Sequence, residues 1–205
     1  MNIHLPKAPC FASLPLETII ANRRSHREFS ASKLTLQQVS QLLWSANGIS
    51  GDSNYRSSPS AGAQYPIEVY AVARQVENVP GGFYRYNISD QTLQLLLKQD
   101  PGSALSEASL DHQPWVAQAA LTLILVADFQ AMQKHFHNQP PIGKRGDRYI
   151  FMESGAMAQN VLLQATALDL GAVLIGGFDN HKVSRLLSLP TKLEPTTLIC
   201  IGVRK

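Results

Sequence analysis

The chain is poor in the residues that mark several functional classes. It has only two cysteines, Cys10 and Cys200, which lie far apart in the sequence. No Cys/His spacing matches that of a metal site, and two distant cysteines make no disulfide framework. The sequence therefore predicts no metal centre, and a reducing compartment, the cytoplasm, is the expected location.

Long apolar runs and dense charge are also missing. The longest apolar stretch, 119–127, is strand-like and too short to span a bilayer. The N-terminus lacks the basic-then-apolar pattern of a signal peptide. The 205 residues carry a formal net charge of only +3, and Lys and Arg form no continuous stripe of the kind that binds nucleic acid. We therefore expect neither a membrane nor a nucleic-acid partner.

What is present is the composition of a globular protein, with 44% hydrophobic and 16% charged residues. Residues 1–15 contain several prolines and little periodicity, so we expect an extended arm that could wrap a partner subunit. Residues 16–205 are expected to form a single domain, because their length suits one good core.

Apolar periodicity and turn residues predict the secondary structure. Helices are expected at 16–22, 35–46, 129–137, 148–170 and 181–187, with one or two more within 103–120. Strands are expected at 67–73, 83–86, 92–97, 121–127, 172–175 and 197–203. Thr35 and Gln38 form a capping-box pattern, and Gly171 should end the longest helix. Because strands and helices do not alternate regularly, the order favours an α+β fold.

A basic cluster near the N-terminus is the strongest candidate for ligand binding. Arg23, Arg24 and Arg27 stand with Ser25 within five positions. Arg offers planar, permanently charged donors that match phosphate oxygens, so the pattern indicates a phosphate site. The alternative is a solvated basic turn, which is what most charge runs are.

Two small-residue segments could approach a flat ligand closely. One is the loop 57–63, which contains Pro59-Ser60-Ala61-Gly62, and the other is Ile175-Gly176-Gly177 at the end of an expected strand. Small side chains let backbone amides reach a ligand. The alternatives are an ordinary surface loop and a tight turn from strand to helix. Arg204 is a further candidate, although an Arg near a terminus is more often only solvated.

The order and spacing of these segments resemble the FMN-dependent nitroreductase superfamily over residues 17–204. Four stretches carry the resemblance: Arg23-Arg24-Ser25-His26-Arg27-Glu28-Phe29, Pro59-Ser60-Ala61-Gly62, Glu153-Ser154-Gly155 with Gln159-Asn160, and Gly176-Gly177 with Gly202-Val203-Arg204. Within the superfamily, the segment 59–70 most resembles the SagB-type dehydrogenase branch, and 81–86 and 144–149 fit it too. Some members of that branch oxidise azoline rings to azoles in peptide products.

The resemblance implies a nitroreductase-like α+β fold, with a central, mostly antiparallel sheet flanked by helices. It also implies an intertwined homodimer with two FMN sites at the interface and the helix 148–170 in the dimer core. The implied FMN contacts are Arg23, Arg24, Ser25, Arg27 and Arg204 at the phosphate and ribityl oxygens, Pro59, Ser60, Ala61 and Gly62 of the other subunit at the isoalloxazine, and Ile175, Gly176 and Gly177 near its reactive centre.

The activity that the resemblance implies is that of an FMN-dependent oxidoreductase. NAD(P)H would pass hydride to FMN, and a quinone-like or nitroaromatic small molecule would then accept the electrons. The sequence assigns no catalytic acid or base. One alternative is a SagB-type dehydrogenase that oxidises a heterocycle or peptide. Another is a non-catalytic flavin-binding protein in which the glycines and arginines are structural.

Two places depart from the family pattern. Ala63 stands where many nitroreductases have Asn. The azoline-oxidising members carry a Lys-Tyr pair, for which Lys134-His135 and Ile142-Gly143-Lys144 are the closest candidates, and neither reproduces it. Lys134, His135, His137 and Lys144 could face a substrate, but a solvated loop is the favoured interpretation.

Overall fold

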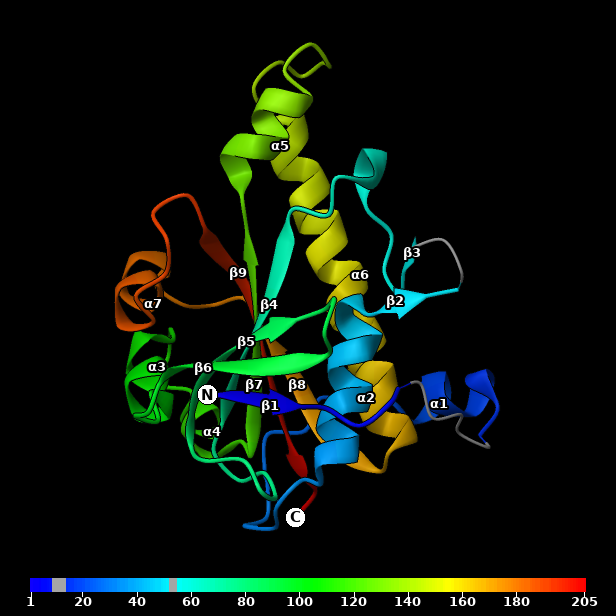
Figure 1. The fold of residues 1–205 in the computed structure, drawn as a ribbon, viewed down its shortest axis with the longest axis vertical. Helices are drawn as coiled ribbons and strands as arrows, with labels where there is room; N and C mark the ends of the chain where they lie inside the picture. The colour runs from blue at the N-terminus through cyan, green and yellow to red at the C-terminus, as the bar shows by residue number, and fades with distance from the viewer. Residues whose placement is uncertain (9–13, 52–54) are drawn as a thin grey trace.

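The computed structural model describes residues 1–8, 14–51 and 55–205, which form a seven-stranded sheet with helices packed against it (Figure 1). The arm expected at 1–15 includes residues 9–13, and the loop expected at 51–64 includes residues 52–54. Those two stretches, and Cys10 with them, lie outside the described residues.

The elements keep the labels of Figure 1. The strands are β1 (Asn2–His4), β2 (Ile49–Ser50), β3 (Tyr55–Arg56), β4 (Ile67–Ala73), β5 (Gly82–Asn87), β6 (Thr92–Leu97), β7 (Leu121–Ala127), β8 (Leu170–Ile175) and β9 (Glu194–Val203). The helices are α1 (Leu16–Asn22), α2 (Leu36–Asn47), α3 (Gly102–Ala108), α4 (Pro114–Gln118), α5 (Phe129–His135), α6 (Arg145–Ala167) and α7 (Asn180–Leu186), with a short 3-10 helix η1 (Ala61–Ala63).

The main sheet has the order β1-β6-β5-β4-β7-β9-β8, and every neighbouring pair in it is antiparallel. The expected α+β fold with a mostly antiparallel sheet is confirmed. β1 pairs with β6 at one edge, so the first residues of the chain extend the sheet. β8 forms the opposite edge, which matters for the candidate site.

The central strand β7 is buried along its whole length. Alternate side chains point to opposite faces of a sheet, and Leu121, Leu123 and Leu125 join the core on one face while Ile124 and Val126 join the core on the other. Because both faces of this strand are covered, all of its residues except Thr122 are apolar.

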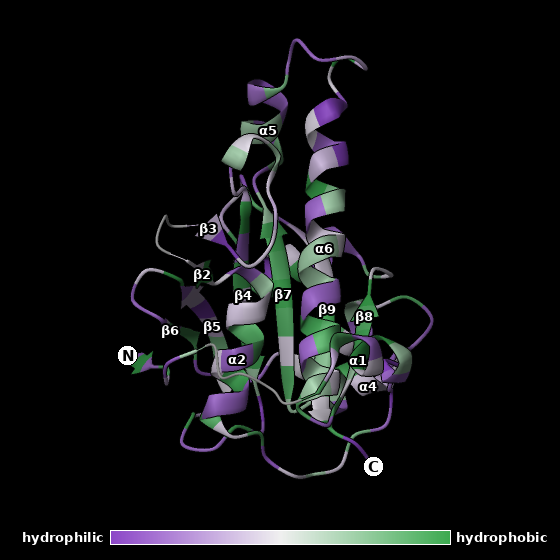
Figure 2. Ribbon diagram, turned by 90° about the vertical axis from the view of Figure 1, so that its right-hand side faces the viewer, coloured by the Kyte–Doolittle hydropathy of each residue, from purple (hydrophilic) through white to green (hydrophobic). Residues whose placement is uncertain are grey.

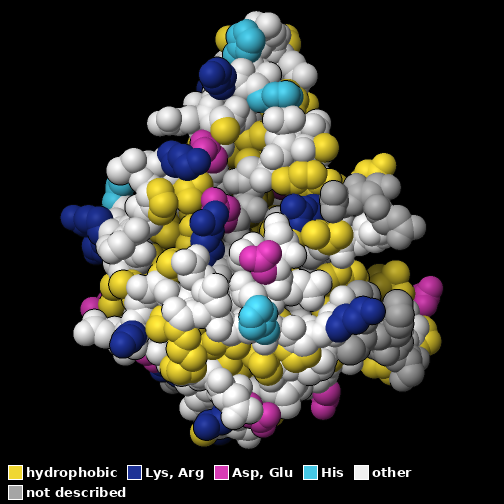
Figure 3. Space-filling view, in the orientation of Figure 1, with side chains coloured by type: hydrophobic (Ala, Val, Ile, Leu, Met, Phe, Trp, Pro, Cys, Tyr) yellow, Lys and Arg dark blue, Asp and Glu magenta, His cyan; other side chains and the backbone are white. Residues whose placement is uncertain are grey.

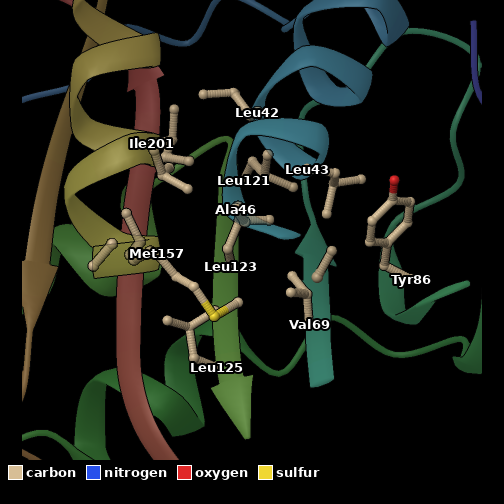
Figure 4. Packing of buried hydrophobic residues seen from close by; sticks show 14 of the residues in the cluster. Leu42, Leu43, Ala46, Val69, Tyr86, Leu121, Leu123, Leu125, Met157 and Ile201 are labelled. Atoms are coloured by element: carbon tan, nitrogen blue, oxygen red, sulfur yellow. The ribbon is translucent and has the colours of Figure 1, made fainter. Parts of the chain in front are cut away.

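The two faces of the sheet carry different helices. α2 and α6 cover one face, where Leu42, Leu43 and Ala46 of α2 and Met157 of α6 pack against β4, β7 and β9 (Figure 4). α3, α4 and α7 lie against the other face through Leu105, Val116 and Val183. Each fully buried large aliphatic side chain contributes about 1.5–3 kcal/mol to folding, so both layers stabilise the sheet.

Several expected bounds were wrong. The long helix α6 covers 145–167 rather than 148–170, and Gly171 lies in β8 instead of ending the helix, which Leu168 does. The helix starts early because Gly146, expected in a loop, allows α6 to approach α5 closely: a Cβ there would lie 2.6 Å from the backbone nitrogen of Gln133. β9 begins at Glu194 rather than Thr197.

The start of α2 tests the local sequence signals. The Thr35 hydroxyl accepts from the Gln38 amide at 3.2 Å, and the Gln38 side chain accepts from the Thr35 amide at 2.9 Å, so the expected capping box is present. Thr35→Ala removes one acceptor from the helix start. We expect a loss of about 1 kcal/mol in the free energy of unfolding, measured by urea denaturation. Thr35→Ser is the matched control and should keep most of the stability, and equal losses in both variants would contradict the capping role.

Candidate functional site

The basic segment lies along the exposed edge of the sheet. Ser25 forms a parallel bridge with Ala172 of β8, and the His26 amide donates to the Ala172 carbonyl at 3.0 Å. Farther along, Phe29 bridges Arg204 and the Ser30 amide donates to the Val203 carbonyl at 2.9 Å. The unpaired backbone groups of an edge strand thus hold this segment, and they bring the arginine cluster beside Arg204.

Two glycines allow this close approach. A Cβ on Gly171 would lie 3.0 Å from the Cβ of His26 and 3.4 Å from the Cγ of Arg204. A Cβ on Gly202 would lie 2.9 Å from two ring atoms of Phe29. Side chains at either position would push the basic segment off β8 and β9, so these glycines fix where the arginines lie.

The cluster contains cationic groups that no carboxylate neutralises. Among the described residues, Arg23, Arg24 and Arg27 form no ion pair. Arg24 donates to the carbonyls of Ala21 and Arg23 at 2.9 and 2.8 Å, and Arg27 stacks over the Trp115 ring with its guanidinium carbon 5.4 Å from the centroid. The cluster can therefore accept an anion without first breaking an ion pair.

Arg204 does have an acidic neighbour, but an exposed one. Its Nη2 lies 3.1 Å from Oδ1 of Asp169, whose side chain is 94% exposed, and its Nε donates to the Leu170 carbonyl at 3.3 Å. Exposed pairs of this kind contribute little energy. Burial and the Arg204 charge both lower the pKa of His26, which disfavours its charged form. Arg24, His26, Asp169 and Arg204 line one open groove of about 460 Å³.

The loop that contains Pro59-Ser60-Ala61-Gly62 is fastened to α6. The Ala61 amide donates to Oε1 of Glu153 at 2.8 Å. Asn160, two turns farther along the same helix, donates to the Ser57 carbonyl at 3.0 Å and to the Ser58 hydroxyl at 2.9 Å. Glu153 and Asn160 thus hold the loop on α6. We refer to residues 57–63 as the Ser loop.

Glu153 is a buried carboxyl group in this role, with 6% of the residue exposed. Burial raises its pKa above the ordinary value, while the Ala61 amide and the Ser60 hydroxyl act in the opposite direction. The group therefore binds a proton more readily in the folded protein than in the unfolded chain.

The segment Ile175-Gly176-Gly177 follows the end of β8. Ile175 is buried, Gly176 is exposed, and Leu174 just before them is 42% exposed. The Gly177 carbonyl accepts from the Leu110 amide at 2.9 Å and from the Gln113 side chain at 3.1 Å, so the connection between α3 and α4 holds this turn. The exposed Gly176 leaves backbone open at the sheet edge.

The sequence-predicted residues thus form two separate groups in one chain. Figure 2 shows α6 between the β2–β3 side, which carries the Ser loop, and the β8 edge. The groove of Arg24 and Arg204 reaches Ala167 at one end of α6, and the Ser loop is bound to Glu153 of the same helix. Ala167 comes fourteen residues after Glu153, so at 1.5 Å per residue these two places lie about 21 Å apart along the helix. Arg24 and Arg204 line one groove beside α6, whereas Arg27 lies over Trp115 of α4, on the opposite face of the sheet. Ile175 to Gly177 lie at the far end of β8, and the Ser loop lies apart from both places.

The projecting end of the molecule, made of α5 and the start of α6, carries histidine and basic side chains (Figure 3). One of them reaches the Ser loop: a Cβ on Gly62 would lie 3.5 Å from Nε2 of His135. Lys134, His137 and Lys144 are exposed, which agrees with the solvated loop expected for them. His135 is also exposed, but it lies where it can face whatever the Ser loop faces.

Sequence reasoning missed two residues of the arginine site. Asp169 and Trp115 contact Arg204 and Arg27, yet both are distant from those partners in the sequence. Neither residue belongs to a sequence motif, and each lies beside its arginine only because of the fold. Among the residues that the structure describes, no group of three or more potential ligands could hold a metal ion, and no helix is both long and apolar enough to cross a membrane.

Comparison with known proteins extends this picture. The model of the nitroreductase family matches residues 20–203. A candidate nitroreductase of Methanocaldococcus jannaschii is 35% identical over 202 residues, which are 98% of this chain and 96% of that protein. A crystal structure of a candidate nitroreductase from Ralstonia eutropha has a TM-score of 0.84 and 30% identity, and covers 100% of this chain and 90% of its own.

More distant relatives have named activities of their own. An NADPH-flavin oxidoreductase of Vibrio harveyi is 27% identical over 196 residues, which are 91% of this chain and 64% of that enzyme. The microcin B17-processing protein McbC of Escherichia coli is 27% identical over 164 residues, which are 77% of this chain and 58% of that protein.

The contact between Glu153 and the Ser loop leads to a stability prediction. Glu153→Ala leaves the Ala61 amide without its acceptor, and we expect a loss of about 1–3 kcal/mol in the free energy of unfolding. Glu153→Gln keeps an acceptor oxygen and removes a charge that burial disfavours.

The pH dependence separates the two effects. Since the folded-state pKa of Glu153 is raised, wild-type stability falls as pH rises from the ordinary glutamate value through the folded value. We expect Glu153→Gln to match the wild type near pH 4.5 and to exceed it increasingly toward pH 7 in urea denaturation. An advantage that shrinks as pH rises would show that ionisation of Glu153 favours folding.

Proposed function

The chain belongs to the nitroreductase family, whose members are flavin-dependent oxidoreductases, and from this premise we propose that it binds FMN between two copies of itself. It would use NAD(P)H to reduce quinone-like or nitroaromatic small molecules. The observation that carries the proposal is the arrangement along the β8 edge. Three arginines without an ion pair among the described residues lie at one end, an exposed glycine lies at the other, and the Ser loop is held on the far side of α6.

The arginine cluster suits the phosphate of FMN. Arg23, Arg24 and Arg27 have no ion-pair partner among the described residues, and Arg204 lies beside them with only an exposed Asp169 as its partner. Guanidinium groups bind phosphate oxygens through charge-assisted hydrogen bonds. Ser25 adds an exposed hydroxyl. We propose that these five side chains hold the phosphate and the ribityl oxygens, which leaves the ring to extend along β8.

The other end of β8 suits the flat ring. Gly176 carries no side chain and is exposed, so its backbone could lie against a polar ring edge. Ile175 and Gly177 are fixed by the sheet and by the α3–α4 connection. Bound FMN would supply the redox chemistry by taking up and releasing hydride. The part of the chain is then to orient the ring, to exclude water and to hold its polar edge.

Pro59, Ser60, Ala61 and Gly62 would complete the site from the second copy. Within one chain α6 lies between the Ser loop and the β8 edge, so the loop of one copy can line only the ring site of the other. His135 would come with it, since its Nε2 lies beside Gly62. That nitrogen could donate or accept a proton at the substrate.

The outer face of α6 suits a dimer contact. Phe151 and Met152 are 59% and 64% exposed, and Leu174 of the neighbouring β8 is 42% exposed. Gly155 lies on the same exposed face, and a Cβ there would meet nothing within 4 Å. A mid-helix glycine costs about 1 kcal/mol relative to alanine. Close packing of a second copy against Gly155 would explain why a glycine stands there. Residues 16–205 would form the FMN-binding domain, to whose sheet residues 2–4 add β1.

A second candidate function rests on the likeness to McbC. In it the chain would act as a SagB-type dehydrogenase that oxidises a heterocycle or peptide at the same FMN site. Anaerobic addition of NADPH or NADH to the yellow protein separates the two: rapid bleaching supports the reductase, and indifference to both supports the dehydrogenase or a non-catalytic flavin-binding protein. Turnover of an azoline substrate would then distinguish these last two.

The proposed phosphate site leads to a binding prediction. Arg23→Ala removes charge-assisted hydrogen bonds to FMN, and we expect its dissociation constant to rise about 10- to 100-fold in a fluorescence titration. Arg185, an exposed arginine of α7, provides the matched control: Arg185→Ala should bind FMN as the wild type does. Equal affinities for the two variants, or no FMN binding by the wild type, would refute the assignment.

The proposed dimer leads to a second prediction. Met152→Lys places a charge on the exposed face of α6, and burying it in an apolar contact would be costly. We expect this variant to sediment mainly as a monomer at micromolar concentration while the wild type sediments as a dimer. Leu96→Lys alters a comparably exposed apolar residue on β6, far from that face, and should remain dimeric. A dimeric Met152→Lys protein would argue against this interface.

A further inference from the structure

A second polar cavity lies away from the β8 edge. It has a volume of about 290 Å³ and opens between the β2–β3 pair, the start of β4 and the β5–β6 hairpin. Its wall includes Arg56, Tyr65, Glu68, Arg85, Tyr86 and Asn87. Basic and acidic side chains lie close together near the centre of the face seen in Figure 3. None of the residues proposed to hold FMN belongs to this wall.

Arg56 is the unusual member of this wall. Its Nε and Nη1 atoms are buried and have no hydrogen-bond partner among the described residues. Its guanidinium carbon lies 5.5 Å from the centroid of the Tyr65 ring. Guanidinium nitrogens that are buried without an acceptor oppose folding. An acceptor from outside the chain would remove this effect.

The carboxylate in the same wall is already engaged. Oε2 of Glu68 lies 3.0 Å from Nε of Arg85 and accepts from the Tyr70 hydroxyl at 2.9 Å. Glu68 and Arg85 therefore neutralise each other, and Arg56, which forms no ion pair within the part of the chain that the structure describes, adds one positive charge to the wall. Tyr86 adds no negative charge, since burial raises its pKa to about 12, although the charge of Arg56 acts in the opposite direction.

Tyr65 is held over Arg56 by a constrained backbone. Its φ is 49°, in the left-handed region that aromatic residues rarely adopt, and its amide donates to the Ser60 hydroxyl at 2.8 Å. Such strain persists only where the surrounding structure determines it. The ring therefore forms a fixed wall for the cavity and keeps the guanidinium in place.

We propose that this cavity binds a small organic acid whose single carboxylate pairs with Arg56 and whose flat body lies beside Tyr65 and Tyr86. The charge of the wall favours one negative charge. A phosphate, which carries close to two, would face Glu68 with its second. The volume equals that of about ten water molecules and suits a compact acid. Asn87 and Gln94 offer side-chain amides for further polar groups of the ligand.

Benzoate is the probe, and benzamide is its uncharged match in size and shape. Both are titrated calorimetrically into the wild-type protein saturated with FMN, so that the arginine cluster is not available to the acid. We expect benzoate to bind with a dissociation constant at or below the millimolar range and benzamide at least tenfold more weakly. Equal binding of both, or no binding of benzoate, would overturn the proposal. Inorganic phosphate that binds more tightly than benzoate would overturn the choice of carboxylate.

Two variants place the binding in this cavity. Arg56→Gln should weaken benzoate binding at least tenfold, while Arg185→Gln on α7 should leave it unchanged. Glu68→Gln, which removes the negative charge from the wall and does not touch Arg56, should tighten binding several-fold at low salt. Because Glu68→Gln makes the cavity more positive and leaves Arg56 in place, it tests anion binding even if Arg56→Gln fails to fold. Unchanged affinity in Arg56→Gln, or weaker binding in Glu68→Gln, would show that benzoate binds elsewhere.

Discussion

The packing of α6 on the edge of the sheet is the contact on which the rest of the candidate site depends. The helix buries one face on β8 and β9, where Ser154 is within 2.8 Å of Thr196, and it presents Glu153 and Asn160 to the Ser loop. Since α6 then lies between the loop and the β8 edge, the chain cannot bring its own two groups of predicted residues together. The proposal of a second copy rests on the position of this one helix.

The same packing explains how a buried carboxyl group can be useful. Glu153 loses solvation on folding, and its raised pKa records that loss. In return its oxygen satisfies the Ala61 amide at the start of η1, where the backbone cannot satisfy itself. Gly62 follows with a φ of 59°, which a residue without a Cβ adopts at no steric cost. The loop is thus shaped by its own backbone and attached by one helix.

Where the sequence carried an unbroken local signal, the prediction was accurate. β4 and β7 have the expected bounds, because each is a mostly apolar segment whose residues are nearly all buried. The expectation failed where tertiary contacts redefine a residue that usually breaks structure. Gly146 lies inside α6 because it packs against α5, and Gly171 lies inside β8 because His26 covers it. Pro195, the second residue of β9, pairs with Val126 beside a register irregularity, a position where the sheet does not require its missing amide.

The site followed the same rule. The arginine cluster, the Ser loop and the glycine turn were recognisable as motifs, because each is contiguous in sequence. Their arrangement in space could not be predicted, since no local sequence pattern indicates that α6 separates the Ser loop from the β8 edge. Trp115 under Arg27 and Asp169 beside Arg204 have no motif at all. Arg56 escaped notice for a related reason: a single arginine in a short strand becomes unusual only when its neighbours are known to offer no acceptor.

The two places with uncompensated arginines differ in what that charge costs the protein. Arg24 and Arg27 are exposed and hydrated, so the absence of a carboxylate partner costs the fold little, and the charge remains free for a ligand. Arg56 has two nitrogens that solvent does not reach, so its charge opposes folding unless an acceptor enters the cavity. An anion at the first site should therefore change stability mainly through its own affinity. At the second site an anion should also supply the acceptor that the buried nitrogens of Arg56 lack. Folding stability should therefore depend more on an anion beside Arg56 than on one beside Arg24 and Arg27.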